Sequence, residues 1–213
     1  MVKKSDVTKA RLLEAATQEF AAYGIAGARV DRIAASASVN KNLIYVYFGN
    51  KERLFDTVYA AAIEELLSAA PFDAQDLPGY AGALFDFYRA HPHLLRLARW
   101  HGLERPAADA LPVAQESTSA KLRELAAAQA DGLVDAGMPA HALLTLVLVL
   151  SSAWSDGSPE GRTPDEDAAL VSLRRHSVVV SVGRLTRPPR PQDGAPALPD
   201  GDAARQTVRT ARN

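Results

Sequence analysis

The stretch "SASVNKNLIYVYFGNKERLF", residues 36–55, combines polar, aromatic and basic side chains within one short segment. A break at 37–39 ends one short helix that starts near residue 30, and a second short helix is expected over 40–48. Gly49 supplies the stop that a helix C-terminus prefers. Two short helices joined by a tight turn predict a helix-turn-helix, in which the first helix crosses the DNA backbone and the second enters the major groove.

The two faces of the second helix differ in chemistry. Ile44 and Phe48 lie on its inner side and suit the packing that fixes the angle between the helices. Its outer side carries amide, ammonium and phenol groups, which hydrogen-bond to base edges and phosphate oxygens. The backbone amides after Asn50 add an anion site at the start of the next helix. The candidate DNA-binding residues are Arg29, Asn40, Lys41, Asn42, Tyr45, Tyr47 and Lys51.

A plainer interpretation of the same residues is structural. Aromatic side chains near the end of a short helix often belong to the core, which applies to Phe48 and in part to Tyr47. Lone lysines are usually solvated surface, and helical hairpins are common. The turn between two helices is therefore a weak signal when it is taken by itself.

Charge is distributed unevenly along the 213 residues. Residues 1–55 hold nine Lys or Arg against five acidic residues, a net charge of +4. Because the whole chain has a net charge of −1, residues 56–213 have a net charge of −5. A basic N-terminal module on an acidic body favours an anionic partner, although chance clustering is an alternative. The absence of cysteine excludes disulfides and thiolate metal sites. It also suits a reducing cytoplasm, which is the expected location because residues 1–20 lack the apolar core of a secretory signal.

The whole pattern is helical, so the expected fold class is all-α. The longest apolar stretch, 142–154, is too short to cross a bilayer and predicts a helix that is buried on most sides. Thr163 and Glu166 form a capping box at the start of the last helix, and Ser5 or Asp6 is the expected cap of the first. The predicted helices span residues 7–23, 30–36, 40–48, 51–69, 77–90, 92–104, 112–136, 140–155 and 163–184.

The segment "RVDRIAASASVNKNLIYVYFGNKERLF", residues 29–55, closely resembles the DNA-binding signature of the tetracycline-repressor-like (TetR) family of transcriptional regulators. The shared features are an Ile-Ala pair, a tight turn, a valine, a polar pair, a core similar to Leu-Tyr-x-Tyr-Phe and a lysine one turn later. Phe20, followed by Tyr23 and Gly24, is also similar to the family. The match covers roughly residues 8–58, and beyond residue 60 the likeness is only of helix number and length.

The resemblance implies a ligand-responsive regulator, a repressor in preference to an activator, which binds palindromic operator DNA as a homodimer. It implies a helix-turn-helix domain over 1–50 and a ligand-binding and dimerisation domain over 51–186. Independently of the resemblance, the composition of residues 187–213 indicates a disordered tail. Family members usually have glycine where this chain has Ser38, so a left-handed serine would cost about 1 kcal/mol. Family members also commonly have a Gly-Thr pair where this chain has Asn42 and Leu43. The resemblance therefore does not specify which base contacts Asn42 makes.

The resemblance also implies a small-molecule effector and a dimer interface in the body. The apolar helix over 140–155 and the last helix, which carries several small residues, could form a four-helix interface with a second copy; the alternative is a bundle core within one subunit. An apolar effector pocket is predicted from middle-helix aromatics and a few polar groups, although core packing is the alternative for each residue. These candidates are Phe85, Tyr88, Trp100, His101, Ser119 and Thr145.

The residues give little support for an enzyme. His91, His93 and His101 lack the matched helical spacing of a metal site, and no nucleophile elbow is present. We therefore expect no catalytic residue, metal or cofactor. A helical protein-interaction adaptor that keeps the fold without operator binding is the remaining alternative. The basic side chains of Arg29, Lys41 and Lys51 argue against it.

Overall fold

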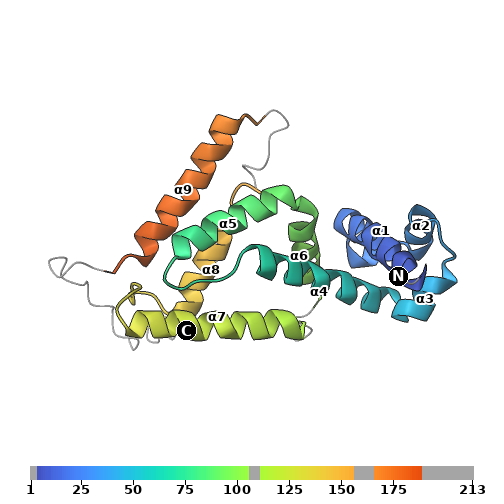
Figure 1. The fold of residues 1–213 in the computed structure, drawn as a ribbon, viewed down its shortest axis with the longest axis horizontal. Helices are drawn as coiled ribbons and strands as arrows, with labels where there is room; N and C mark the ends of the chain where they lie inside the picture. Colours follow the sequence, from blue (N-terminus) through green and yellow to red (C-terminus); the bar gives the residue numbers. More distant parts are fainter. Residues whose placement is uncertain (1–3, 106–110, 156–165, 189–213) are drawn as a thin grey trace, which may run out of the picture.

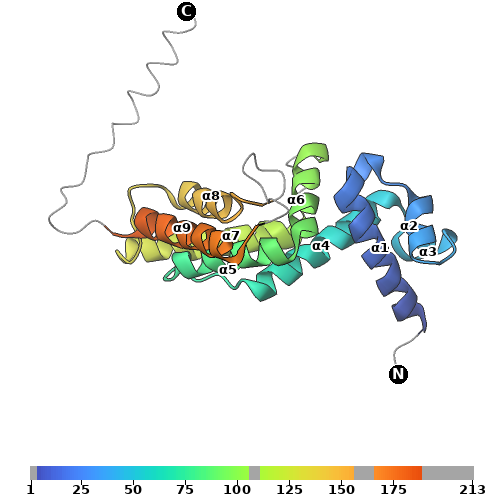
Figure 2. The ribbon, with the colours of Figure 1, turned by 90° about the horizontal axis from the view of Figure 1, so that it is seen from above.

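The computed structural model describes residues 4–105, 111–155 and 166–188, and within these ranges it contains nine α-helices and no strand. The helices α1–α3 form a head at one end, α4 runs from the head into the body, and α5–α9 form the body (Figures 1 and 2). No helix in the described part of the chain has both the length and the apolar composition that a membrane crossing requires. The helices are α1 (Lys4–Gly27), α2 (Val30–Ser36), α3 (Asn42–Phe48), α4 (Lys51–Ala69), α5 (Leu77–Ala90), α6 (Pro92–Glu104), α7 (Pro112–Ala130), α8 (Ala140–Ser151) and α9 (Ala168–Thr186).

The core of the head extends into the body. Phe20 of α1 and Phe55 of α4 are fully buried at its centre, with their rings edge to face and their centroids 5.2 Å apart. Ile33 and Ile44 bring α2 and α3 onto the same core. Leu97 of α6 is also part of this cluster, so α6 packs against the head although it follows α5 in the chain. The head and α6 therefore share one hydrophobic core.

A second core lies where α5 packs against α8 and α9, and α7 joins it by packing against α8. Leu84 of α5, Leu125 of α7, Val147 of α8 and Val182 of α9 are fully buried there. The prediction that the apolar helix over 140–155 is buried on most sides is wrong for the single chain. One side of α8 packs on the body core, and the other side is exposed, as Val149 with 58% of its surface accessible illustrates.

Most helices lie where the sequence predicts, but several ends differ. The first helix begins at Lys4, so that Ser5 and Asp6 lie inside it. Its regular part ends at Gly24, with φ 70° and ψ −172°, close to the predicted end, and a short helical segment continues beyond this kink to Gly27. Helix α7 ends at Ala130, six residues before the predicted end, because Gly132, with φ 71°, follows it.

The last helix begins at Ala168, where the Asp167 side chain accepts a hydrogen bond from the Leu170 amide. The predicted start at Thr163 lies outside the described residues. Glu166 is described, and it forms ion pairs with Arg89 of α5 and Arg174 of α9. The predicted tail over 187–213 also lies outside the described residues from position 189 onward.

Candidate nucleic-acid interface

Backbone hydrogen bonds and a left-handed serine fix the turn between α2 and α3. The Ala37 amide donates to the Ile33 carbonyl at 2.9 Å, and the Val39 amide donates to the Ala34 carbonyl at 3.0 Å. Between them, Ser38 has φ 52°, the left-handed conformation expected at this position. Ala34 and Ala37 are buried, and their small side chains allow the two helices to approach closely. The turn therefore holds α3 at a defined angle to α2.

Helix α3 has a buried side and a well-exposed side. Ile44 and Phe48 lie in the head core, whereas Tyr45 keeps 47% of its surface accessible and Val46 keeps 73%. Asn42, at the start of the helix, is also exposed. Tyr47 is half-buried, with its ring against Phe48 at a centroid distance of 6.2 Å. Asn42, Tyr45 and Val46 thus form the open surface of the recognition helix, and Tyr47 lies at its edge.

Two predicted DNA-binding side chains have partners within the head. The Asn40 side-chain oxygen accepts a hydrogen bond at 2.8 Å from the amide of Asn42, the first residue of α3. The Lys41 ammonium lies 2.9 Å from an Asp31 carboxylate oxygen on α2. This contact lowers the pKa of Asp31 and raises the pKa of Lys41 above its ordinary value. Both groups are therefore charged at neutral pH, and the pair ties α3 to α2 on the exposed surface.

The two predicted basic residues at the helix starts lie close to the end of α1. The Lys51 ammonium donates to the Ala26 and Ala28 carbonyls at 3.2 and 3.3 Å, so it also connects α4 to α1. The Arg29 side chain is exposed at the start of α2, and its backbone amide donates to a Glu19 carboxylate oxygen at 2.8 Å. The Asn50 side chain accepts from the Arg53 amide at 2.7 Å and so caps the start of α4.

Sequence reasoning missed three acidic side chains that support this surface. Buried Glu19 of α1 binds both the Arg29 amide and the Arg32 guanidinium, and Asp31 pairs with Lys41. Glu104 of α6 accepts a hydrogen bond from the Ala26 amide at 2.7 Å. These contacts join residues that are between 10 and 78 positions apart. The only sequence signal is an acidic residue within a basic segment.

Helix α6 contacts the kink of α1 directly. The Trp100 indole donates to the Ala21 carbonyl at 3.3 Å, next to the Glu104 contact with the Ala26 amide. A side chain at Gly24 would lie within 3 Å of both Trp100 and Glu104. Trp100, which the sequence places in an effector pocket, therefore lies at the junction between head and body.

The structure does not gather the six predicted pocket residues around one cavity. Phe85 is buried in the body core, and Ser119 and Thr145 are exposed on α7 and α8. The His101 ring lies against the Tyr59 ring, tilted by 30° with centroids 4.8 Å apart, and its buried Nε2 has no hydrogen-bond partner among the described residues. Of the six, Tyr88 lines an apolar cavity of about 70 Å³ between α4, α5 and α6. Burial there raises the pKa of Tyr88 to about 12.

A helix-turn-helix head with an open recognition helix, mounted on an all-helical body, defines a class of DNA-binding regulators. Comparisons with known proteins place the chain within that class. Residues 12–58 match the profile described as "Bacterial regulatory proteins, tetR family", and residues 76–184 match "Tetracyclin repressor-like, C-terminal domain". The chain therefore belongs to the TetR family of transcriptional regulators, whose members bind operator DNA as dimers and respond to small molecules.

Individual relatives agree with this assignment. The HTH-type transcriptional repressor SCO4008 of Streptomyces coelicolor is 42% identical over 158 residues, which cover 73% of this chain and 81% of that protein. The HTH-type transcriptional repressor NicS of Pseudomonas putida is 28% identical over 110 residues, covering 48% of this chain and 52% of NicS. The crystal structure of the transcriptional regulator SCO4942 from S. coelicolor superposes with a TM-score of 0.74 and 37% identity, covering 85% of this chain and 99% of that one.

Proposed function

We propose that this chain is a cytoplasmic, non-enzymatic repressor that binds a palindromic operator through α2 and α3 and releases it when a small apolar effector enters the body. The observation that carries the proposal is the two-sided recognition helix. Its apolar side is locked into the head core, while Asn42 and Tyr45 are open to a partner. Phenol and amide groups at such positions bind phosphate oxygens and base edges.

Exposed apolar side chains on α8 and α9 support a dimer that forms through these two helices. Leu146 and Val149 of α8 are 38% and 58% accessible, and Leu173 of α9 is 61% accessible. The two helices also pack against each other. Large aliphatic side chains exposed on two helices that pack against each other favour burial against a second copy. A two-fold axis through this face would place two recognition helices on successive major grooves, about 34 Å apart, which accounts for a palindromic operator.

The small cavity beside Tyr88 is the proposed entry point of the effector. Its lining is apolar or aromatic, with Tyr59, Leu66 and Phe87 among its residues. Its volume of about 70 Å³ is well below the roughly 300 Å³ of typical ligand pockets, so the effector must open it. Helix α6 forms one wall and also holds the kink of α1 through Glu104. An effector that displaces α6 would therefore move the head, provided that it binds one position of α6 better than the other.

Selection of bound sequences from random duplex DNA with the purified protein tests this function. We expect enrichment of a palindrome, and a binding constant that falls steeply with added salt because phosphate contacts release counterions. Lys41→Ala and Tyr45→Ala should weaken binding while sedimentation still shows the wild-type oligomer. No enriched sequence, or a flat salt response, would instead favour the adaptor.

A further inference from the structure

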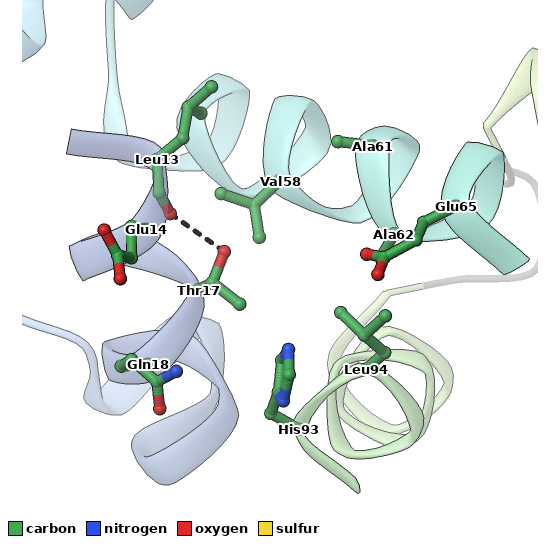
Figure 3. Close-up of a pocket in the computed structure, with 10 residues that line it drawn as sticks. All are labelled: Leu13, Glu14, Thr17, Gln18, Val58, Ala61, Ala62, Glu65, His93 and Leu94. Carbon is green, nitrogen blue, oxygen red and sulfur yellow. Dashed lines mark hydrogen bonds between the residues drawn. The ribbon is translucent and has the colours of Figure 1, made fainter. Parts of the chain in front are cut away.

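A larger cavity, of about 340 Å³, lies where the head meets the body. Its walls come from α1, α4 and α6 (Figure 3). It is distinct from the small cavity beside Tyr88, although Ala62 and Leu94 line both and so form the partition between them. We call it the junction cleft. Its lining residues are Leu13, Glu14, Thr17, Gln18, Val58, Ala61, Ala62, Glu65, His93 and Leu94.

The junction cleft combines an apolar floor with hydrogen-bond acceptors. In Figure 3 the Glu65 carboxylate, the His93 imidazole and the Thr17 hydroxyl all face the space between the helices. The Thr17 hydroxyl already donates its proton to the Leu13 carbonyl at 2.8 Å, which leaves its oxygen lone pairs as acceptors. Val58 and Leu94 point into the same space. None of the ten lining residues is a lysine or arginine.

The two histidines beside the cleft differ in their surroundings. His91 Nδ1 lies 3.3 Å from a Glu65 carboxylate oxygen, so this histidine orients the carboxylate from outside the ten lining residues. Burial is the main reason that the pKa of His93 lies below its ordinary value; His91 and Arg96 lower it further, and Glu65 opposes them. A neutral imidazole has one nitrogen that accepts a hydrogen bond.

We propose that the junction cleft binds a primary or secondary ammonium group carried on a short apolar chain. Such a cation supplies the N–H donors that the acceptors on Glu65, His93 and Thr17 require. Its hydrocarbon part would lie against Val58 and Leu94. The carboxylate attracts the positive charge, and no lysine or arginine in the lining opposes it. The cleft volume falls within the range of small-ligand sites.

The position of the cleft links this ligand to the head. Helix α1 belongs to the head, α4 connects head and body, and α6 belongs to the body. A ligand that touches all three walls favours one position of α1 relative to α6. This regulatory consequence rests on the proposed function, whereas the binding itself does not. If operator binding changes the position of the head, amine and operator must alter each other's affinity by the same factor.

Calorimetric titration of the full-length protein with n-hexylamine at neutral pH tests the site. We expect saturable 1:1 binding per chain, with n-hexanol and hexyltrimethylammonium at least about tenfold weaker, because the first lacks charge and the second lacks N–H donors. Glu65→Gln should weaken amine binding by a similar factor. Glu64→Gln, the same change one position earlier and outside the cleft lining, should not. Equal affinity for all three probes, or equal loss in both variants, would refute the site.

A second variant tests the site by blocking its space. Ala61 is exposed and lines the cleft, so Ala61→Phe should abolish amine binding while circular dichroism and the melting temperature stay unchanged. Repeating the titration with a selected operator duplex tests the linkage separately. A changed amine affinity supports the coupling, and an unchanged one refutes it while leaving the site intact. Failure of the protein to bind any duplex would refute the proposed function but not the amine site, which the titration without DNA measures.

Discussion

At the scale of single residues, the turn of the helix-turn-helix carries measurable strain at Ser38. Its φ of 52° is unfavourable for any residue with a Cβ, at a cost of about 1 kcal/mol. Ser38→Gly should relieve this strain, partly offset by the greater unfolded-state entropy of glycine, and raise the free energy of unfolding by up to about 1 kcal/mol. Urea denaturation measures the change. The control, Ser36→Gly at the helical end of α2, should lower the free energy instead, and a loss of stability in Ser38→Gly would show that the turn is unstrained.

The ion pair between Lys41 and Asp31 leads to the prediction that removing the Asp31 charge increases the affinity for DNA. Asp31 holds the Lys41 ammonium at 2.9 Å and places a negative charge on the proposed DNA-facing surface. Asp31→Asn should therefore tighten operator binding at low salt by up to about fivefold, the range of an exposed ion pair, and the gain should shrink as salt is added. Asp131→Asn makes the same net-charge change directly after α7, whose C-terminal end lies far from the head in Figure 1, and should have no effect. Fluorescence anisotropy across a salt series distinguishes the two results.

Residue-scale features could be predicted from the sequence where they are local. The exposure of Asn42 and Tyr45 follows from helical spacing, and the left-handed Ser38 agrees with the glycine that family members usually have at this position. The partner of Lys41 could not be predicted in this way, because Asp31 reaches it only through the angle between α2 and α3. The same reason applies to Glu19, which binds residues of the next helix.

At the scale of helices, the kink in α1 shows why the exact ends of the helices were harder to predict than their presence. A glycine with positive φ either ends a helix or bends the chain, and local sequence does not distinguish the two at Gly24. Helix α6 stabilises the observed bend, because its Glu104 accepts a hydrogen bond from the Ala26 amide beyond the kink. Helix α7 shows the opposite case, because Gly132 follows its last residue and ends it before the predicted end at residue 136.

The kink leads to the prediction that replacing Gly24 by alanine strongly lowers the free energy of unfolding. Gly24 has a backbone conformation that is almost exclusive to glycine, and a Cβ there would lie within 3 Å of Trp100 and Glu104. Gly24→Ala should therefore lower the free energy of unfolding by about 2 kcal/mol or more, as measured by urea denaturation. The matched control is Gly102→Ala in α6, where a Cβ meets nothing within 4 Å. That change should be neutral or stabilising by at most about 1 kcal/mol, and similar losses in both variants would show that the kink is relaxed.

At the scale of the whole molecule, the sequence predicted the all-α class but not how the helices are grouped. The pocket prediction brought together residues of four helices on the basis of their chemistry alone. The structure instead separates Trp100 at the head junction from Thr145 on the exposed side of α8. Which side chains share a cavity depends on the angles between helices, and local sequence does not specify those angles. Similarly, the inclusion of α6 in the head core follows from long-range packing.

The exposed apolar side of α8 leads to the prediction that charged residues placed on it weaken the dimer. If Leu146 and Val149 face a second copy, the double variant Leu146→Glu/Val149→Glu would bury unpaired charges on association, at a cost of several kcal/mol. The dimer dissociation constant should rise by at least about 100-fold, as measured by sedimentation velocity over a concentration series. Affinity for a full palindrome should fall with it, while the weaker binding to one half-site should be retained because the recognition helix is unaltered. Leu133→Glu, an equally exposed leucine outside both helices, is the control and should leave the dimer intact. A double variant that still sediments as the wild type would show that the copies meet through another face.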